Sequence, residues 1–126
     1  MIPNLLITDD DEALRLSLGE AFERRGFQVT LAADGQEALD VVHSATIHMA
    51  LVDVHMPRVS GLQLIERLRG DELEVPCILM SAALDESIRH EAESMHVFRI
   101  LDKPFRLADV ASTVRQGLAE HYGWAG

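Results

Sequence analysis

Short apolar runs alternate with longer amphipathic stretches from one end of the 126-residue chain to the other. The runs have the length and composition of buried strands. Between them, apolar residues recur at the i, i+3 and i+4 positions that line one face of a helix. This alternation is typical of βαβ units built around a parallel sheet. It predicts strands over residues 4–8, 28–32, 49–53, 75–81 and 98–101.

Each predicted strand is followed by a helical pattern. The apolar positions of these patterns are Leu14, Leu18 and Phe22; Ala38, Val41 and Val42; Leu62, Ile65 and Leu68; Ile88, Ala92 and Met95; and Leu107, Val110, Ala111, Val114 and Leu118. Gly26 can close the first helix and Gly70 the third. Asp34 and Glu37 have the spacing of a capping box before the second helix, and Pro76 stands near a strand start, where proline is tolerated.

Five strands and five helices fit the length of one ordinary domain. Because parallel crossovers are right-handed, few topologies remain. We predict an α/β fold with a doubly wound five-stranded parallel sheet, flavodoxin-like (βα)5, in strand order 2-1-3-4-5. Ligands of such sheets bind beyond the carboxyl ends of the strands, where the strand order reverses. The residues that end each strand are therefore the candidates for chemistry.

The formal net charge of -10 narrows the range of partners. It argues against a nucleic-acid-binding surface, which needs clustered lysine and arginine. The single Cys77 lies in an apolar strand pattern, where a small buried hydrophobe is favoured over a reactive thiol, and it can form no disulfide within the chain. We find no secretory signal and no apolar run of membrane-spanning length, so we expect a cytoplasmic protein.

Polar and charged side chains end four of the predicted strands. They are Asp9, Asp10, Asp53, Ser81 and Lys103, the last being the only lysine of the chain. Carboxylates packed together oppose one another's ionisation unless a cation compensates them. Oxygen ligands without histidine or cysteine at matching spacing suit Mg2+. An aspartate beside such a metal can attack a phosphoryl group, while a lysine and a hydroxyl stabilise the charged oxygens.

Four segments occur in register with these strand ends: ITDDDE, LVDVHMPRVSG, LMSA and DKPF. Together they resemble the receiver domain of two-component response regulators, over nearly the whole chain. The resemblance implies that Asp53 is the phosphoacceptor, Ser81 the switch hydroxyl and Lys103 the phosphate-binding lysine. It also implies a Mg2+ site formed by Asp10, Asp53 and the backbone carbonyl of His55, with Asp9 acting through a water molecule. Pro104 resembles the family's proline after this lysine, often preceded by a cis peptide, and Met56, Pro57 and Gly61 resemble the turn after the acceptor.

The resemblance also implies a signalling role. A sensor histidine kinase or histidine phosphotransfer protein would supply the phosphoryl group, and the switched domain would control an unknown output domain or target protein. Residues 1–121 would form the receiver domain, and residues 122–126 a C-terminal tail or the start of a linker. No enzymatic activity beyond self-phosphorylation and self-dephosphorylation is expected, nor direct contact with nucleic acid or membrane. A homodimer remains open.

Two departures from the family pattern concern the switch. Ile100 stands three positions before the lysine, where the family usually has a tyrosine or phenylalanine that moves with the switch hydroxyl. Strand alternation would place Phe98 on the same face as Ile100, as a partial substitute. His96 and Val97 replace the Gly-Ala pair that commonly precedes the fifth strand. Phosphate chemistry is expected to survive these changes, whereas signal transmission is expected to be non-standard.

Other interpretations of the same residues remain open. Asp11 and Glu12 are expected only to cap the first helix, and Asp10 alone would suggest the same role. The chain could be a degenerate receiver that binds partners without phosphorylation. It could also be a Mg2+-dependent phosphohydrolase with an aspartate nucleophile, although His55 stands where haloacid-dehalogenase-like enzymes carry a second acid. Nucleotide binding is disfavoured, since neither a G-x-G-x-x-G nor a Walker A sequence occurs.

Overall fold

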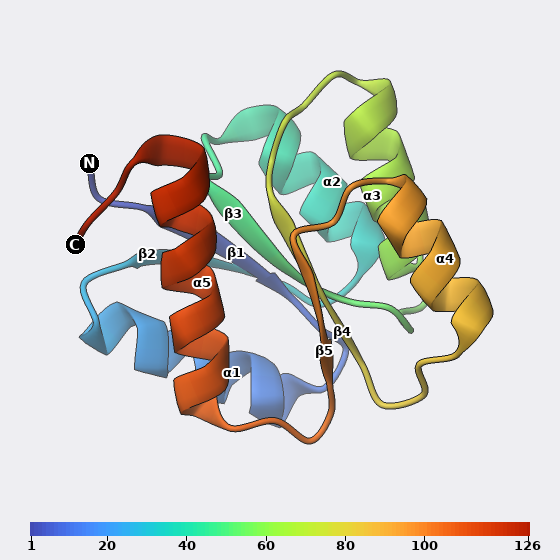
Figure 1. Cartoon of the computed structure of the whole chain (residues 1–126), viewed down its shortest axis with the longest axis horizontal. Helices are drawn as coiled ribbons and strands as arrows, with labels where there is room; N and C mark the ends of the chain where they lie inside the picture. The colour runs from blue at the N-terminus through green and yellow to red at the C-terminus, as the bar shows by residue number, and fades with distance from the viewer.

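The strands form a single parallel sheet in the order β2-β1-β3-β4-β5, as predicted (Figure 1). The computed structural model describes residues 1–126. The strands are β1 (Asn4–Thr8), β2 (Gln28–Ala32), β3 (Met49–Asp53), β4 (Cys77–Ser81) and β5 (Arg99–Asp102). β1 pairs with β2 on one side and β3 on the other, so the strand order reverses beside the carboxyl ends of β1 and β3.

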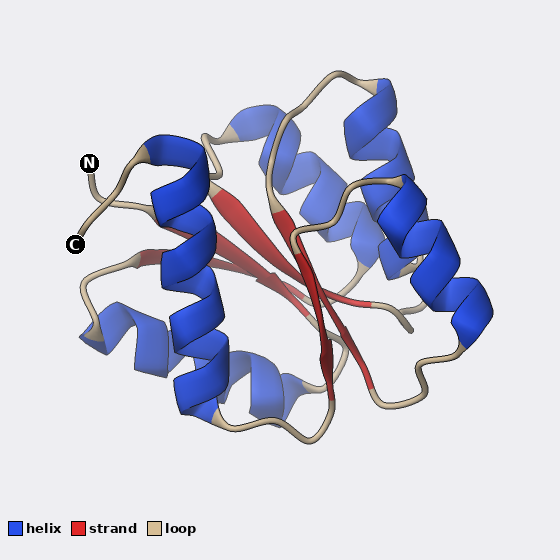
Figure 2. Ribbon diagram, viewed as in Figure 1, coloured by secondary structure: helices blue, strands red, loops and turns tan.

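Helices cover both faces of the sheet (Figure 2). They are α1 (Glu12–Arg24), α2 (Gly35–Ser44), α3 (Gly61–Gly70), α4 (Glu86–Ser94) and α5 (Leu107–Tyr122). One core cluster joins the sheet to α2, α3 and α4, and the other joins it to α1 and α5. Every residue of β3 and β4 is buried. Central parallel strands buried on both faces read as continuous apolar runs, which explains why the sequence pattern was clear there.

Side-chain caps begin four of the helices. Asp11, Asp34, Ser60 and Asp85 each accept a hydrogen bond from the backbone N–H three residues later. The predicted capping box at α2 forms only in part. Asp34 accepts from Glu37 N–H at 2.9 Å, but the Glu37 carboxylate accepts from the N–H of Ala33, at 3.0 Å, and not from that of Asp34. The reciprocal capping box lies at Ser60 and Gln63 instead.

Two predicted strands begin later than expected. β4 starts at Cys77, after Pro76, and β5 starts at Arg99, because Phe98 lies in a bend. Strand alternation therefore does not extend to Phe98. Phe98 packs in the cluster with α1 and α5, whereas Ile100 packs against the other cluster. The prediction that Phe98 shares a face with Ile100 and partly replaces the missing aromatic ring is wrong.

Cys77 is fully buried, and its Sγ donates to the carbonyl oxygen of Val75 at 3.3 Å. Burial raises the pKa of this thiol to about 11, which agrees with a structural rather than reactive cysteine. At the chain end, Trp124 packs against Phe27 with ring centroids 5.4 Å apart. None of the helices combines the length and apolar content that crossing a bilayer requires.

Gly61, the first residue of α3, packs tightly against the end of β3. A Cβ atom added there would overlap the carbonyl oxygen of Asp53, and the Gly61 N–H donates to Val54 O at 2.9 Å. Gly61→Ala should therefore lower the free energy of unfolding by about 1–3 kcal/mol, the usual cost of overpacking. Urea titration measures this change. Gly70→Ala is the matched control, because nothing lies within 4 Å of an added Cβ there, and it should be neutral or slightly stabilising.

Candidate functional site

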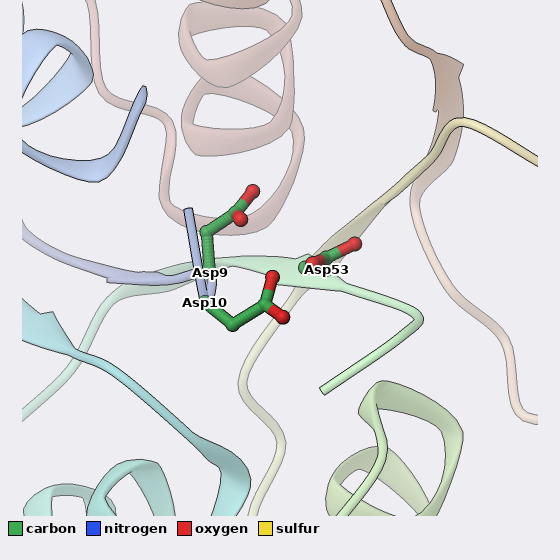
Figure 3. A group of neighbouring side chains, drawn as sticks. All are labelled: Asp9, Asp10 and Asp53. Atoms are coloured by element: carbon green, nitrogen blue, oxygen red, sulfur yellow. The ribbon is translucent and has the colours of Figure 1, made fainter. Parts of the chain in front are cut away.

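Three carboxylates meet at the carboxyl edge of the sheet (Figure 3). Asp9 and Asp10 directly follow β1, and Asp53 is the last residue of β3. Each offers one oxygen, and these atoms all lie within 4.8 Å of one another. Because β1 and β3 are paired neighbours, the topology brings together acids that stand more than forty residues apart in the sequence.

Lys103 lies between two of these acids. Its Nζ is 2.7 Å from Asp9 Oδ2 and 3.5 Å from Asp53 Oδ1. Burial opposes the charged form of the ammonium, but the hydrogen bond to Asp9 and the charge of Asp53 outweigh it and raise the pKa of Lys103. Asp9 is completely buried, and its other carboxylate oxygen accepts from the N–H of Asp11 at 2.9 Å. Asp9 is thus a fully paired buried charge.

At the Asp53 carboxyl group, the effects that oppose ionisation outweigh the attraction of the lysine. Burial, followed by the charge of Asp9, raises its pKa to about 6, while the charge of Lys103 acts against this rise. One ammonium therefore does not neutralise the cluster, because the exposed Asp10 adds a third carboxylate to it. The arrangement favours a further cation with oxygen ligands, and this acidic cluster could hold a metal ion.

The remaining predicted site residues lie in or directly after the neighbouring strands β3, β4 and β5. Ser81 ends β4 and is 1% exposed; its hydroxyl oxygen accepts from the N–H of Ala83 at 3.1 Å, and its carbonyl accepts from Lys103 N–H at 2.8 Å. His55 is exposed in the loop that follows β3. Ile100 is half-buried in β5, opposite Leu79 of β4. Ser81 is therefore connected to the lysine through the backbone, while Ile100 lies deeper along the sheet.

Several supporting residues were not identified from the sequence. The Arg15 guanidinium donates to the carbonyl oxygen of Asp9 at 2.7 Å. Arg58, with a φ of 65°, forms an ion pair with Asp34 at 2.5 Å and so connects the loop after β3 to the start of α2. The buried Thr8 hydroxyl contacts Met56 Sδ at 3.2 Å. No motif or spacing singles out such residues, because each acts through a tertiary contact to backbone or to another loop.

Comparisons with known proteins agree with this geometry. The model of the response regulator receiver domain matches residues 5–115. The chain belongs to this family. Response regulator MprA of Mycobacterium tuberculosis is 35% identical over 115 residues, which cover 91% of this chain and 50% of that protein. The transcriptional activator protein PfeR of Pseudomonas aeruginosa is 37% identical over 108 residues, 86% of this chain and 35% of that protein.

Solved receiver structures support the same fold. The receiver domain of a Francisella response regulator is 27% identical and covers 94% of this chain and 98% of its own, with a TM-score of 0.88. A CheY-like receiver domain protein from Methanospirillum hungatei shares the fold, with a TM-score of 0.91, 22% identity, and coverage of 95% of this chain and 96% of its own. The receiver spans about half the length, or less, of the curated relatives it matches.

The Lys103–Pro104 peptide bond is cis, as the resemblance suggested. Asp11 forms the N-cap of α1 and accepts from Leu14 N–H at 3.2 Å, so its predicted capping role is confirmed. Asp10, one residue earlier, instead belongs to the carboxylate cluster. The two neighbouring aspartates thus differ in the structure, since Asp11 caps a helix and Asp10 lies in the carboxylate cluster.

The raised pKa of Asp53 gives a pH-dependent stability. Its folded pKa of about 6 exceeds the ordinary aspartate value of 3.8, so its stabilising contribution is full below about pH 4 and is lost as the pH rises through about 6. In metal-free buffer at pH 7, Asp53→Asn should therefore raise the free energy of unfolding by roughly 1–3 kcal/mol. At pH 4 the two proteins should be about equally stable.

Urea titrations at several pH values in EDTA measure this difference. Asp102→Asn, which changes an exposed carboxylate at the end of β5, is the matched control and should show no such pH-dependent gain. A stability difference for Asp53→Asn that is the same at pH 4 and pH 7 would contradict the proposed balance of burial and charge at this site.

Proposed function

We propose that this receiver accepts a phosphoryl group on Asp53 in the presence of Mg2+. The observation that carries the proposal is the position of Asp53 at the carboxyl edge of the sheet, with an Asp10 oxygen within 4.8 Å of one of its own and Lys103 Nζ 3.5 Å from its Oδ1. Phosphorylation and Mg2+ are typical of this family. The Mg2+ ligands in this proposal are Asp10, Asp53 and the backbone carbonyl of His55, with Asp9 acting through a water molecule.

The residues of the cluster fit this cation. They supply oxygen only, they include one exposed carboxylate, Asp10, and their charge exceeds that of the single lysine. Mg2+ keeps several waters and takes one or two carboxylates together with phosphate oxygens, so it needs no closed protein cage. When bound, it would neutralise the charge that collects on the phosphoryl oxygens during transfer.

Asp53 supplies the nucleophile. One of its carboxylate oxygens attacks the phosphorus of a donor phosphohistidine, the P–N bond breaks, and the imidazole leaves with the electron pair and takes up a proton. The product is an aspartyl phosphate. Lys103 Nζ lies 3.5 Å from Asp53 Oδ1, where a compact ammonium can bind one phosphoryl oxygen. Arginine, with a broad planar guanidinium, is a poor replacement for such a point charge.

The switch begins at Ser81 in this proposal. Its hydroxyl oxygen accepts from Ala83 N–H, which leaves the hydroxyl proton available for a phosphoryl oxygen on Asp53. Turning toward that oxygen breaks the contact to Ala83 and displaces the loop between β4 and α4. Ile100 replaces the usual ring, and Phe98 packs on the opposite cluster. Transmission must therefore pass through this loop and the aliphatic Ile100.

The cellular role follows the family. We propose that a sensor histidine kinase or histidine phosphotransfer protein in the cytoplasm is the donor, and that residues 1–121 form the receiver that controls an output domain or target protein. Curated relatives are longer than this chain, which supports an output domain in those proteins. Binding without phosphorylation and phosphate-ester hydrolysis are the competing functions, and no contact in the site favours either of them.

Phosphorylation is tested with a small donor, so that no partner has to be known. Incubation with phosphoramidate and Mg2+ should add one phosphoryl group to the intact protein, measured by mass spectrometry, and base should release it. Asp53→Asn should incorporate none, whereas the control Asp102→Asn should behave like the wild type. EDTA should reduce incorporation strongly. Normal labelling of Asp53→Asn would exclude Asp53 as the acceptor, and steady turnover of small phosphate esters would favour the phosphohydrolase.

The role of Lys103 is tested separately from the acceptance of the phosphoryl group by Asp53. Lys103→Arg keeps the positive charge beside Asp9 and should fold and bind Mg2+, yet fail to couple phosphorylation to the switch. NMR shows this directly: the amide signals of Ala83 and Ile100 should shift on phosphorylation of the wild type but not of the variant. The same shifts in both proteins would mean that charge alone suffices at position 103.

A further inference from the structure

Arg15 is the second cation at the acidic edge. It lies in the first turn of α1 and is half-buried. A cation there is opposed by the positive end of the helix dipole, which makes this position locally unfavourable. Its guanidinium Nη1 nevertheless donates to the backbone carbonyl oxygen of Asp9 at 2.7 Å. This short charge-assisted hydrogen bond ends on the turn that carries two of the three clustered carboxylates.

Each polar group of Asp9 is occupied. Its N–H donates to Ala32 O at 3.3 Å, one carboxylate oxygen accepts from Asp11 N–H at 2.9 Å, and the other accepts from Lys103 at 2.7 Å. Arg15 holds the remaining group, the carbonyl. That carbonyl belongs to the same planar peptide unit as the N–H of Asp10. Fixing it therefore fixes the plane from which the Asp10 side chain departs.

The side chains of Asp9 and Asp10 leave the end of β1 in different directions (Figure 3). Asp9 is buried and anchored by its own partners, whereas Asp10 is exposed, and the backbone of the turn sets the direction in which its Cα–Cβ bond leaves the chain. From these contacts we infer that Arg15 is a positioning residue for divalent-cation binding: by holding the Asp9 carbonyl, it keeps Asp10 within reach of Asp53. The inference rests on the proposed Mg2+ site.

Two effects of Arg15 on Mg2+ affinity have opposite signs. Its positive charge repels a divalent cation, so removing the charge alone would strengthen binding. Its hydrogen bond orders a ligand, and loss of such an outer-shell partner typically weakens metal binding by about 10–100-fold. The direction of the change on substitution therefore distinguishes a positioning role from a purely electrostatic one.

The experiment is an isothermal titration of the full chain with Mg2+. Arg15→Ala should lower the affinity by about tenfold or more, and Arg15→Lys, which keeps a charge and a donor, should recover part of it. Arg24→Ala is the matched control on the same helix: Arg24 is exposed and paired only with Glu20, at 3.9 Å. The affinity of the Arg24→Ala variant for Mg2+ should equal that of the wild type or be slightly higher.

A second readout separates positioning from damage to the fold. At saturating Mg2+, phosphoramidate should phosphorylate Arg15→Ala at close to the wild-type rate, because the cation then restores the ligand geometry. Unchanged or tighter Mg2+ binding by Arg15→Ala overturns the inference while leaving the proposed function intact. A low rate that excess Mg2+ does not restore also overturns it. Absence of Mg2+ binding by the wild type overturns both.

Discussion

The ammonium of Lys103, held between Asp9 and Asp53, is the interaction on which this site depends. Asp9 is completely buried, and a carboxylate there is tolerated only because the lysine and a backbone N–H pair with it. The same lysine reaches Asp53 at a longer distance and compensates it only in part. The short ion pair thus neutralises the buried Asp9, and the longer one leaves Asp53 only partly compensated, which favours a further cation at the cluster.

The surrounding fold fixes the positions of these charged residues. β3 and β4 are buried along their whole length, so the residues that end them have little freedom. Gly61 packs directly on the Asp53 carbonyl, and Arg58 connects the loop after β3 to the cap of α2. The backbone on both sides of Asp53 is therefore held by contacts outside the carboxylate cluster.

The helices differ in how far the core covers them, and α4 is the least buried of the five. α4 has a single buried residue, Ala92, while α3 has four. Elements with few buried apolar contacts open and shift at low cost. Ser81 ends β4, before the loop that leads to α4, and Ile100 packs against the core cluster to which Ala92 of α4 belongs.

The sequence by itself determined the elements, the strand order and the identity of the acidic residues, because buried parallel strands are apolar throughout and their ends are marked by charge. It also separated Asp11, a helix cap, from the metal-site candidates. It misplaced Phe98, since a bend before β5 interrupts the alternation on which that prediction relied. Only the tertiary structure revealed Arg15 and Arg58, because their partners are a backbone carbonyl and a residue of another loop, and neither contact leaves a periodic pattern in the sequence.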